Sequence, residues 1–309
     1  MSMHSTRNGR RASSGEAEYT LTDPWPIISI VTPSFNQAQF LERTIQSILS
    51  QGYPALEYII VDGGSTDNSL EIIERYADRL KWWASGPDGG QAEAIARGFD
   101  HSTGEILCWV NSDDVLLPGA LQAVGDYFRS NPRAEVVTGA AYCIDEADRP
   151  IRHLLQCTYT RGVHASASRF MFYGQDGVYQ QATFWRSTAY FAVGGMRKSL
   201  SFAMDLDLFT RLAQRKRFGV ISRYLACFRL HDASKSSTLE HIRKEEVALL
   251  RLDRSALGTH PLLRRILFGW YRTISLLRKS ILQGRAVLGF EQFPPIAKLS
   301  PDFGVRRDA

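Results

Sequence analysis

Short apolar runs alternate with amphipathic segments through the first half of the sequence, and this alternation constrains the fold more than any other feature. The runs, rich in β-branched residues, cover residues 27–32, 56–62, 105–110 and 135–142. A continuous apolar run is typical of a strand buried on both faces, and the segments between the runs have helical periodicity. Strands that alternate with helices form a mainly parallel sheet with helices on both faces. We therefore predict a Rossmann-like α/β fold.

The pattern changes along the chain and predicts a division into parts. Residues 1–25 are polar and Arg-containing, with no apolar stretch that could serve as a signal peptide, and predict a disordered tail. The alternation occupies residues 26–142. Residues 143–240 predict a mixed region with short strands and a helix that begins near Asp205, and residues 241–309 predict a helical extension. The chain has 309 residues and is 44% hydrophobic, which is enough for a well-buried core.

The extension is basic and amphipathic over residues 260–289. No acidic residue lies between Asp253 and Glu291, although the net charge of the whole chain is only +5. Apolar residues recur there at helical spacing and form a stripe. Such a helix can lie on an anionic membrane surface, or its stripe can pack on the protein body while its arginines face water. The sequence leaves both alternatives open.

The lengths of the apolar runs and the cysteine spacing predict a cytoplasmic protein, soluble or peripheral on the inner face of the cell membrane. No apolar run approaches the roughly 18 residues typical of a membrane span. The cysteines are far apart and form no CxxC pair, which fits a reducing compartment. We expect no nucleic-acid partner.

Polar residues follow the predicted strands where each strand ends. They are Thr32-Pro33-Ser34, Asp62-Gly63-Gly64-Ser65 and Asn111-Ser112-Asp113-Asp114. In an open parallel sheet, ligands bind outside the carboxyl ends of the strands. One acidic turn alone is usually a helix cap, but two together can hold a divalent cation that neutralises a diphosphate leaving group. The chain has neither GxGxxG nor GxxxxGK[ST], which argues against dinucleotide and P-loop enzymes.

The chain carries a series of short motifs in a specific order. The first four are SIVTPSFNQAQFLERTIQSILSQ, YIIVDGGSTDNS, GQAEAI and CWVNSDDVLLPGAL, and the last four are QQATFWR, VGGMR, AMDLDLFTRLA and FRLHDASKS. Together they resemble the family 2 glycosyltransferases, which have the GT-A fold: the first four resemble the nucleotide-sugar domain and the last four the acceptor-side half. The resemblance implies a donor half over 26–142 and an acceptor and catalytic half over 143–240. It also implies an inverting transfer from a nucleoside diphosphate sugar, UDP-sugar above all, to a hydroxyl of a glycan or lipid-linked acceptor in cell-surface polysaccharide synthesis.

The resemblance assigns the donor base and ribose to the end of the first strand. Thr32, Pro33 and Ser34 would line that pocket, with Asp62 alongside. Many relatives carry a second Asp that hydrogen-bonds the uracil ring, and this chain has Gly63 in its place. Base recognition must therefore differ here.

The same resemblance implies a Mn²⁺ or Mg²⁺ site. Asp113 matches the metal-binding carboxylate of a DxD motif, whereas Asn111 replaces the first Asp and offers only hydrogen bonds. His231 is the implied second metal ligand. The other implied donor contacts in these two motifs are Asn111, Ser112, Lys235 and Ser236.

An inverting transfer also needs a base that takes the proton of the acceptor hydroxyl. The family usually has an acidic pair at the start of the helix after its GG turn, and here the pair is Met204-Asp205. We assign the base to Asp205, which can at the same time cap the helix, and give Asp207 much less weight. Polar groups and an aromatic ring suit the acceptor sugar, and we expect them from Asp88, Gln91, Gln181 and Trp185. Trp185 fits the core equally well.

Other readings compete with this one. Asn111, Gly63 and Met204 depart from the family pattern and favour a catalytically inactive sugar-binding or nucleotide-binding scaffold of the same fold. A sugar-nucleotide pyrophosphorylase is a weaker alternative, because TPSFNQ is not the glycine-rich, arginine-containing loop of those enzymes.

Overall fold

The computed structural model describes residues 24–154, 178–215 and 218–232, together with Ser234 and seven helical positions between 242 and 277. The predicted N-terminal tail lies outside these residues, apart from its last two positions. Most of the extension over 241–309 does so as well, including nearly all of the basic stripe. Within the described residues, no helix combines the length and apolarity that crossing a membrane requires.

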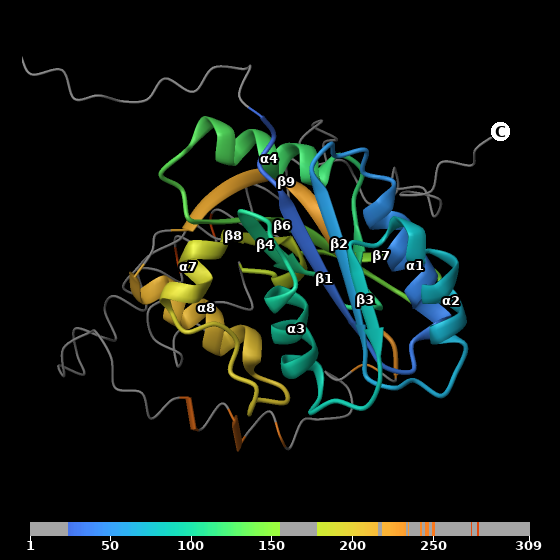
Figure 1. Ribbon diagram of the computed structural model, residues 1–309. Helices are drawn as coiled ribbons and strands as arrows, with labels where there is room; N and C mark the ends of the chain where they lie inside the picture. Colours follow the sequence, from blue (N-terminus) through green and yellow to red (C-terminus); the bar gives the residue numbers. More distant parts are fainter. Residues whose placement is uncertain are drawn as a thin grey trace, which may run out of the picture.

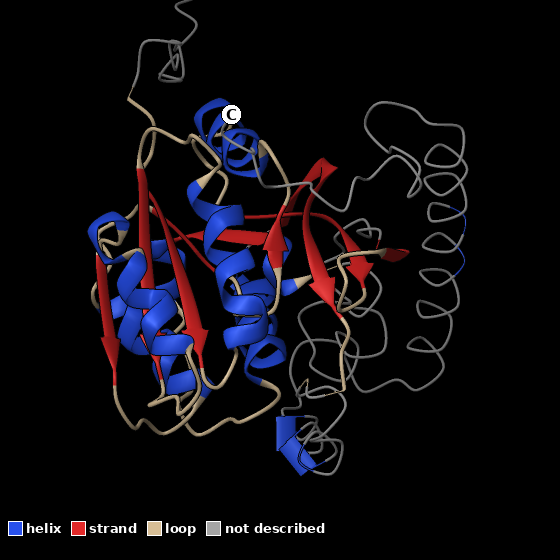
Figure 2. Ribbon diagram, turned by 90° about the vertical axis from the view of Figure 1, so that its right-hand side faces the viewer, coloured by secondary structure: helices blue, strands red, loops and turns tan. Residues whose placement is uncertain are grey.

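One nine-stranded sheet organises the chain, in the order β3-β2-β1-β4-β8-β6-β9-β5, with β7 paired to β6 (Figures 1 and 2). The strands are β1 Ile28–Ser34, β2 Leu56–Asp62, β3 Trp82–Ser85, β4 Ile106–Trp109, β5 Val115–Leu116, β6 Val136–Ile144, β7 Pro150–Leu154, β8 Thr183–Arg186 and β9 Phe218–Arg229. All four apolar runs of the first half form strands, as predicted.

The two halves of the sheet differ in strand direction. β3, β2, β1 and β4 are parallel neighbours, with Ser34 paired to Asp62 and Val31 paired to Trp109. β8 then runs antiparallel between β4 and β6, and only the β6–β9 pair is parallel in the second half. The prediction of a parallel first half and a mixed second region is confirmed.

Helices cover both faces of this sheet, which is also as predicted. They are α1 Ala38–Leu49, α2 Ser69–Arg75, α3 Gln91–Asp100, α4 Ala120–Ser130, α7 Ser187–Ala192 and α8 Met204–Arg215. α1, α2 and α4 bury their apolar faces in one core cluster, and α3, α7 and α8 bury theirs in another. The sheet between them is accordingly apolar on both sides.

The acceptors for the first turn of α1 come from another part of the chain. Asn36, just before the helix, has φ 51°, and its Oδ1 accepts a hydrogen bond from the Thr66 amide at 2.8 Å. Asp67 instead accepts from the Ala38 amide at 2.9 Å, and the Ser69 hydroxyl accepts from the Gln37 amide. The turn after β2 thus supplies the acceptors that the first amides of α1 need.

Candidate active site

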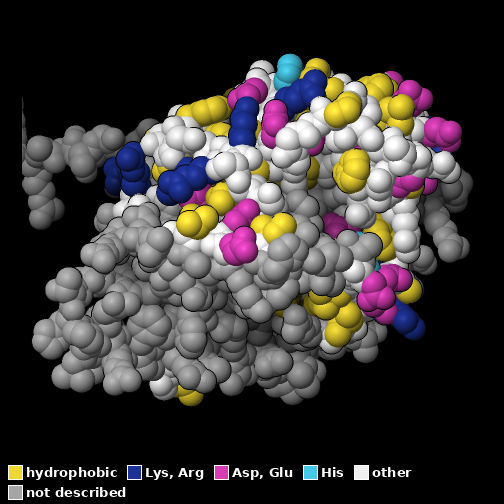
Figure 3. All heavy atoms as spheres, turned by 90° about the horizontal axis from the view of Figure 1, so that it is seen from below, with side chains coloured by type: hydrophobic (Ala, Val, Ile, Leu, Met, Phe, Trp, Pro, Cys, Tyr) yellow, Lys and Arg dark blue, Asp and Glu magenta, His cyan; other side chains and the backbone are white. Residues whose placement is uncertain are grey.

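The carboxyl ends of the parallel strands meet at one edge of the sheet, at the lower end of Figure 1. Ser34 of β1 is paired with Asp62 of β2, which is paired with Ser85 of β3. Figure 3 views the molecule from this side and shows both acidic and hydrophobic side chains exposed there. The predicted strand-end residues therefore lie on one face, as expected for a ligand site of an open parallel sheet.

The carboxylate of Asp62 is used by its own turn. It is fully buried, and its Oδ2 accepts hydrogen bonds from the Gly64 amide at 3.1 Å, the Ser65 amide at 2.9 Å and the Ser85 hydroxyl at 2.7 Å. Its Oδ1 accepts from the Ser65 hydroxyl at 2.5 Å. A carboxylate with four donors has little acceptor capacity left. Asp62 shapes the floor of the site and does not face an opening.

The last residues of β1 differ in their surroundings: some lie in the core and one lies at the candidate site. Thr32 is fully buried and its hydroxyl accepts a hydrogen bond from the Tyr58 hydroxyl at 3.0 Å, so its side chain belongs to the core. Pro33 is buried too. The Ser34 hydroxyl, next to Asp62, is buried and has no hydrogen-bond partner among the described residues. A buried hydroxyl without a partner suits a ligand contact at this edge.

A carboxylate from the turn after β3 lies over Gly63. A Cβ added to Gly63 would be 3.3 Å from both carboxylate oxygens of Asp88 and 3.4 Å from the ring of Phe35. The Asp88 carboxylate is held there by the Gly90 amide at 2.7 Å, and Phe35 is 59% exposed. Asp88, predicted to contact the acceptor, therefore lies at the base of the β1 and β2 turns. Phe35 escaped the sequence analysis because nothing in TPSFNQ shows that its ring is exposed.

Asn111 ties the end of β4 to its surroundings. Its Oδ1 accepts a hydrogen bond from Gln91 Nε2 at 2.7 Å, and its Nδ2 donates to Gln180 Oε1 and Asp114 Oδ2, both at 3.3 Å. The amide group is fully occupied by protein partners. Gln91, predicted as an acceptor contact, is engaged here as well.

Asp113 and His231 come together from positions 118 residues apart in the chain. Asp113 Oδ2 and His231 Nε2 are 3.0 Å apart, and the His231 ring lies beside Phe40, with ring centroids 4.7 Å apart. The Asp113 side chain is 18% exposed and that of His231 only 3%. The described residues contain no group of three or more His, Cys, Asp or Glu side chains that could hold a metal ion. One carboxylate oxygen and one imidazole nitrogen are an incomplete but chemically suitable donor set for a divalent cation, which other groups would complete.

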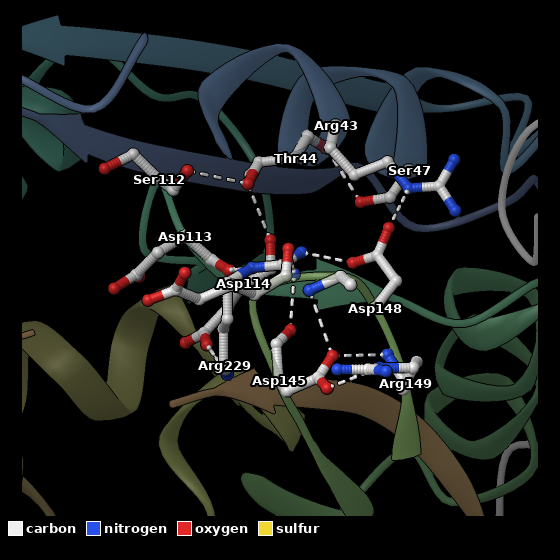
Figure 4. Close-up of polar contacts among 12 residues, drawn as sticks. Arg43, Thr44, Ser47, Ser112, Asp113, Asp114, Asp145, Asp148, Arg149 and Arg229 are labelled. Atoms are coloured by element: carbon white, nitrogen blue, oxygen red, sulfur yellow. Dashed lines mark hydrogen bonds and ion pairs between the residues drawn. The ribbon is translucent and has the colours of Figure 1, made fainter. Parts of the chain in front are cut away.

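A buried arginine braces this site from β9 (Figure 4). Arg229 is 1% exposed, and its Nε donates to the Asp113 carbonyl at 2.8 Å while its backbone amide donates to Asp114 Oδ1 at 2.9 Å. Its guanidinium also forms an ion pair with Asp148 at 2.6 Å, and Asp148 pairs with Arg43 at 3.0 Å. Sequence reasoning missed Arg229, although it stands two residues before His231.

Asp114 has a structural place in the same network. Burial and the neighbouring charge of Asp113 raise its pKa well above the ordinary value, against the lowering effect of Arg229 and Asn111. The Thr44 hydroxyl donates to the carbonyls of Asp114 and Ser112, at 2.7 and 2.9 Å. Ser112 is buried and Asp114 fully so. The turn therefore presents Asp113 and keeps Asp114 inside.

Asp205 is the second residue of α8 and is half-buried. Its Oδ1 accepts a hydrogen bond from the Leu206 amide at 2.7 Å, and burial raises the pKa of its carboxyl group. Phe209, one turn further along the same face, stacks on Trp109 of β4 with ring centroids 6.0 Å apart. Asp205 is thus on the helix face that packs toward the strand leading to Asn111.

Asp207 is a different kind of carboxylate. It is buried and pairs with Arg197 at 3.1 Å and with Arg211 at 2.6 Å. Arg211 also donates to the carbonyls of Val193 and Gly195, so the pair closes the glycine turn before α8. These contacts leave Asp205 as the candidate base.

The remaining predicted residues do not form an acceptor surface. Trp185 is completely buried between the rings of Trp109, Phe99 and Phe209, so its predicted contact with an acceptor sugar is wrong. Gln181 is buried in a short 3₁₀ turn. Lys235 and Ser236 lie outside the described residues.

Comparison with known proteins places this chain in a family. A sequence model described as glycosyl transferase family 2 matches residues 29–195, more than half of the 309 residues. An uncharacterized glycosyltransferase of Mycobacterium tuberculosis is 27% identical over 189 residues, which cover 61% of this chain and 69% of that protein.

Two solved structures share the fold. S. aureus TarS in complex with UDP-GlcNAc matches with a TM-score of 0.57 and 16% identity, over 75% of this chain and 68% of that one. The mannosyltransferase PcManGT from Pyrobaculum calidifontis, in complex with GDP-Man and Mn²⁺, matches with a TM-score of 0.54 and 17% identity. The match covers 90% of this chain and 81% of that one. The architecture is the GT-A fold, as predicted. The family model and the relatives together show that the chain is a glycosyltransferase and belongs to glycosyl transferase family 2.

Proposed function

We propose that this chain is an inverting, metal-dependent glycosyltransferase that moves a sugar from a nucleoside diphosphate to a hydroxyl of a glycan or lipid-linked acceptor, in cell-surface polysaccharide synthesis. The observation that carries the proposal is the separation of two acidic groups. Asp113 faces His231 at the carboxyl end of β4. Asp205, with a raised pKa, lies on the helix face that packs toward the same strand.

Asp113 and His231 would hold the cation on the donor side. An imidazole in the donor set favours Mn²⁺ over Mg²⁺, because Mg²⁺ is usually bound through oxygen atoms alone. When bound, the cation would neutralise charge on the diphosphate leaving group. The complex of PcManGT with GDP-Man and Mn²⁺ supports this choice by analogy. Lys235 and Ser236 remain proposed phosphate contacts, and the Ser34 hydroxyl is a proposed ribose contact.

The donor base would lie against Phe35. An exposed aromatic ring offers a stacking surface for a base. The Asp88 carboxylate beside it accepts hydrogen bonds and donates none, so it favours a base with a ring N–H at its pairing edge. Uracil and guanine carry that N–H, whereas cytosine and adenine offer only an exocyclic amino group there. We therefore propose a UDP-sugar donor, with a GDP-sugar as the alternative. Asp88 would make the hydrogen bond to the base that Gly63 cannot make.

Asp205 would take the proton of the acceptor hydroxyl as that oxygen attacks the anomeric carbon. Direct displacement inverts the configuration at that carbon, and the proton must leave the attacking oxygen in the same step. Burial raises the pKa of Asp205 toward the operating pH, which strengthens a carboxylate as a base.

The test is sugar transfer by Asp205→Asn. We expect kcat to fall about 10²- to 10⁴-fold, the usual contribution of general base catalysis, while nucleoside diphosphate binding in the presence of Mn²⁺ persists. Asp78→Asn, at an exposed position outside the site, is the matched control and should leave kcat unchanged. Full transfer by Asp205→Asn would show that another group is the base. A wild-type protein that uses no nucleotide sugar and binds no nucleoside diphosphate with Mn²⁺ would favour the inactive scaffold.

We further propose that the protein is cytoplasmic and reaches a lipid-linked acceptor through peripheral membrane contact of residues 260–289. The support is the basic amphipathic stripe in the sequence. Flotation with anionic liposomes tests it: protein lacking 260–289 should remain unbound, and binding equal to that of the intact chain would refute the contact.

A further inference from the structure

The entrance to the catalytic helix α8 is held by a side chain from much later in the chain. Glu246 Oε1 accepts a hydrogen bond from the Ser201 amide at 2.6 Å. Its Oε2 accepts from the Phe202 amide at 2.9 Å and from the Ala203 amide at 2.7 Å. One carboxylate thus binds three consecutive amides that lead directly into Met204 and Asp205.

The residue immediately before the helix has no side chain that could accept these hydrogen bonds. Ala203 immediately precedes the helix, and the Asp207 amide donates to its carbonyl at 3.0 Å. An alanine side chain has no acceptor, although the amides at a helix entrance need one. A carboxylate is favoured there because the helix N-terminus carries partial positive charge. Met204, where the resemblance leads us to expect an acidic residue, contributes an apolar side chain to the core.

The segment that carries Glu246 is anchored to the protein body. Glu246 is 9% exposed, and Leu250, four residues later, is buried in the same core cluster as Met204 and Leu206. Residues four apart lie on one face of a helix, so this face packs on the region of α8. Glu245, the neighbour of Glu246, is exposed.

We propose that Glu246 is a positioning residue for the catalytic base, an inference that rests on the proposed role of Asp205. By holding the amides of 201–203, the Glu246 carboxylate fixes the first turn of α8 and therefore the direction of the Asp205 side chain. The segment around Glu246 completes the acceptor side of the active site, although it lies beyond the residues matched by the family model.

The first test compares Glu246→Ala, Glu246→Gln and Glu245→Ala in the full-length protein. Glu246→Ala should lower kcat for transfer about 10- to 100-fold, because misplacing a catalytic group by about 1 Å has effects of that order. The KM for the donor and the dissociation constant for UDP with Mn²⁺ should change less than about twofold, since the donor side does not depend on this clamp. Glu246→Gln keeps one acceptor oxygen and should recover most of kcat, and Glu245→Ala should match the wild type.

Two results would overturn the proposal: full kcat in Glu246→Ala, or a parallel loss of kcat and donor affinity, which would indicate general disruption of the fold. Amide hydrogen exchange over residues 201–206 provides a second measurement that needs no activity. Faster exchange in Glu246→Ala supports the clamp, and unchanged exchange refutes it. If the wild type itself transfers no sugar, the proposed function fails, and the exchange result alone decides whether Glu246 holds the helix entrance.

Discussion

The turns after β2 and β4 look alike in sequence but differ in what their carboxylates do. Both follow a buried strand and both begin at the ligand-binding edge of the sheet. In the first turn, amides and hydroxyl groups of neighbouring residues use up the carboxylate of Asp62. In the second turn the two roles are divided: Asp114 is buried in the Arg229 network, and Asp113 is left to face His231. With a second acid in the turn, one carboxylate remains for the proposed donor site.

The largest expected effect follows from removing the carboxylate of Asp113, which faces His231. Asp113→Asn should lower kcat/KM for sugar transfer about 10³-fold, because a cation that neutralises the leaving group contributes several kcal/mol to transition-state stability. The melting temperature should change little, since the Asp113 side chain holds no backbone amide of the described residues. Initial rates at saturating Mn²⁺ check this prediction. A loss of less than about threefold would show that Asp113 is not part of the donor site.

Removing the carboxylate of the other turn should affect stability instead. Asp62→Ala leaves two amides and two hydroxyl groups of the turn without their acceptor, and unmet buried donors cost about 1–3 kcal/mol each. Because the turn can relax toward water, we expect the free energy of unfolding to fall by about 3 kcal/mol in total. Urea denaturation measures this loss. The matched variant Asp113→Ala should lower the free energy of unfolding by about 1 kcal/mol or less. Equal losses in the two variants would remove the distinction between the turns.

Replacing Arg229, which holds the backbone of Asp113, should have a smaller effect. We expect that effect in the Mn²⁺ concentration that activity requires. Arg229→Lys keeps the positive charge but loses the forked donors to Asp113, Asp145 and Asp148. We expect about tenfold more Mn²⁺ to be needed for half-maximal activity, in the range known for groups that orient metal ligands. Arg149→Lys, whose side chain is 75% exposed on the same loop, is the control and should behave as the wild type. An unchanged Mn²⁺ requirement in Arg229→Lys would mean that the brace does not position Asp113.

Asp205 is a third carboxylate, and its difference from the other two should appear in the pH dependence of kcat. Burial raises its pKa, so its active, deprotonated form is lost as the pH falls through a value above the ordinary range of aspartate near 4. We expect kcat to fall about tenfold per pH unit below that point. This fall of kcat at low pH should be absent from the residual activity of Asp205→Asn. If the variant still shows the fall, the group that titrates is not Asp205.

The fold was predictable because its signals are local. The alternation of apolar runs and amphipathic segments located β1, β2, β4 and β6 and the helices α1, α2, α3 and α4, whereas the short strands β3 and β5 were not predicted. Local signals do not reveal what caps α1, because the partner of Asn36 and the acceptors for the first amides of α1 lie about 30 residues away in the next turn. Trp185 was ambiguous because β8 runs between β4 and β6 and is buried on both faces, which a short aromatic run does not reveal.

The site was less predictable because its contacts are distant in the chain. The pairing of Asp113 with His231 came from the family resemblance, since no spacing rule joins residues 118 positions apart. The contacts of Arg229 and Glu246, and the placement of Asp88 over Gly63, depend on how the sheet folds and cannot be deduced from any one motif. Residues that hold a site often carry no signature of their own.

The most direct test of the central claim is UDP binding measured by calorimetry with and without Mn²⁺, in the wild type, Asp113→Asn and Asp62→Asn. We predict that Mn²⁺ strengthens binding by at least about tenfold in the wild type and in folded Asp62→Asn, and that Asp113→Asn loses this dependence. Binding that ignores Mn²⁺ in the wild type, or that keeps its full Mn²⁺ dependence in Asp113→Asn, would contradict the assignment of Asp113 to the donor site.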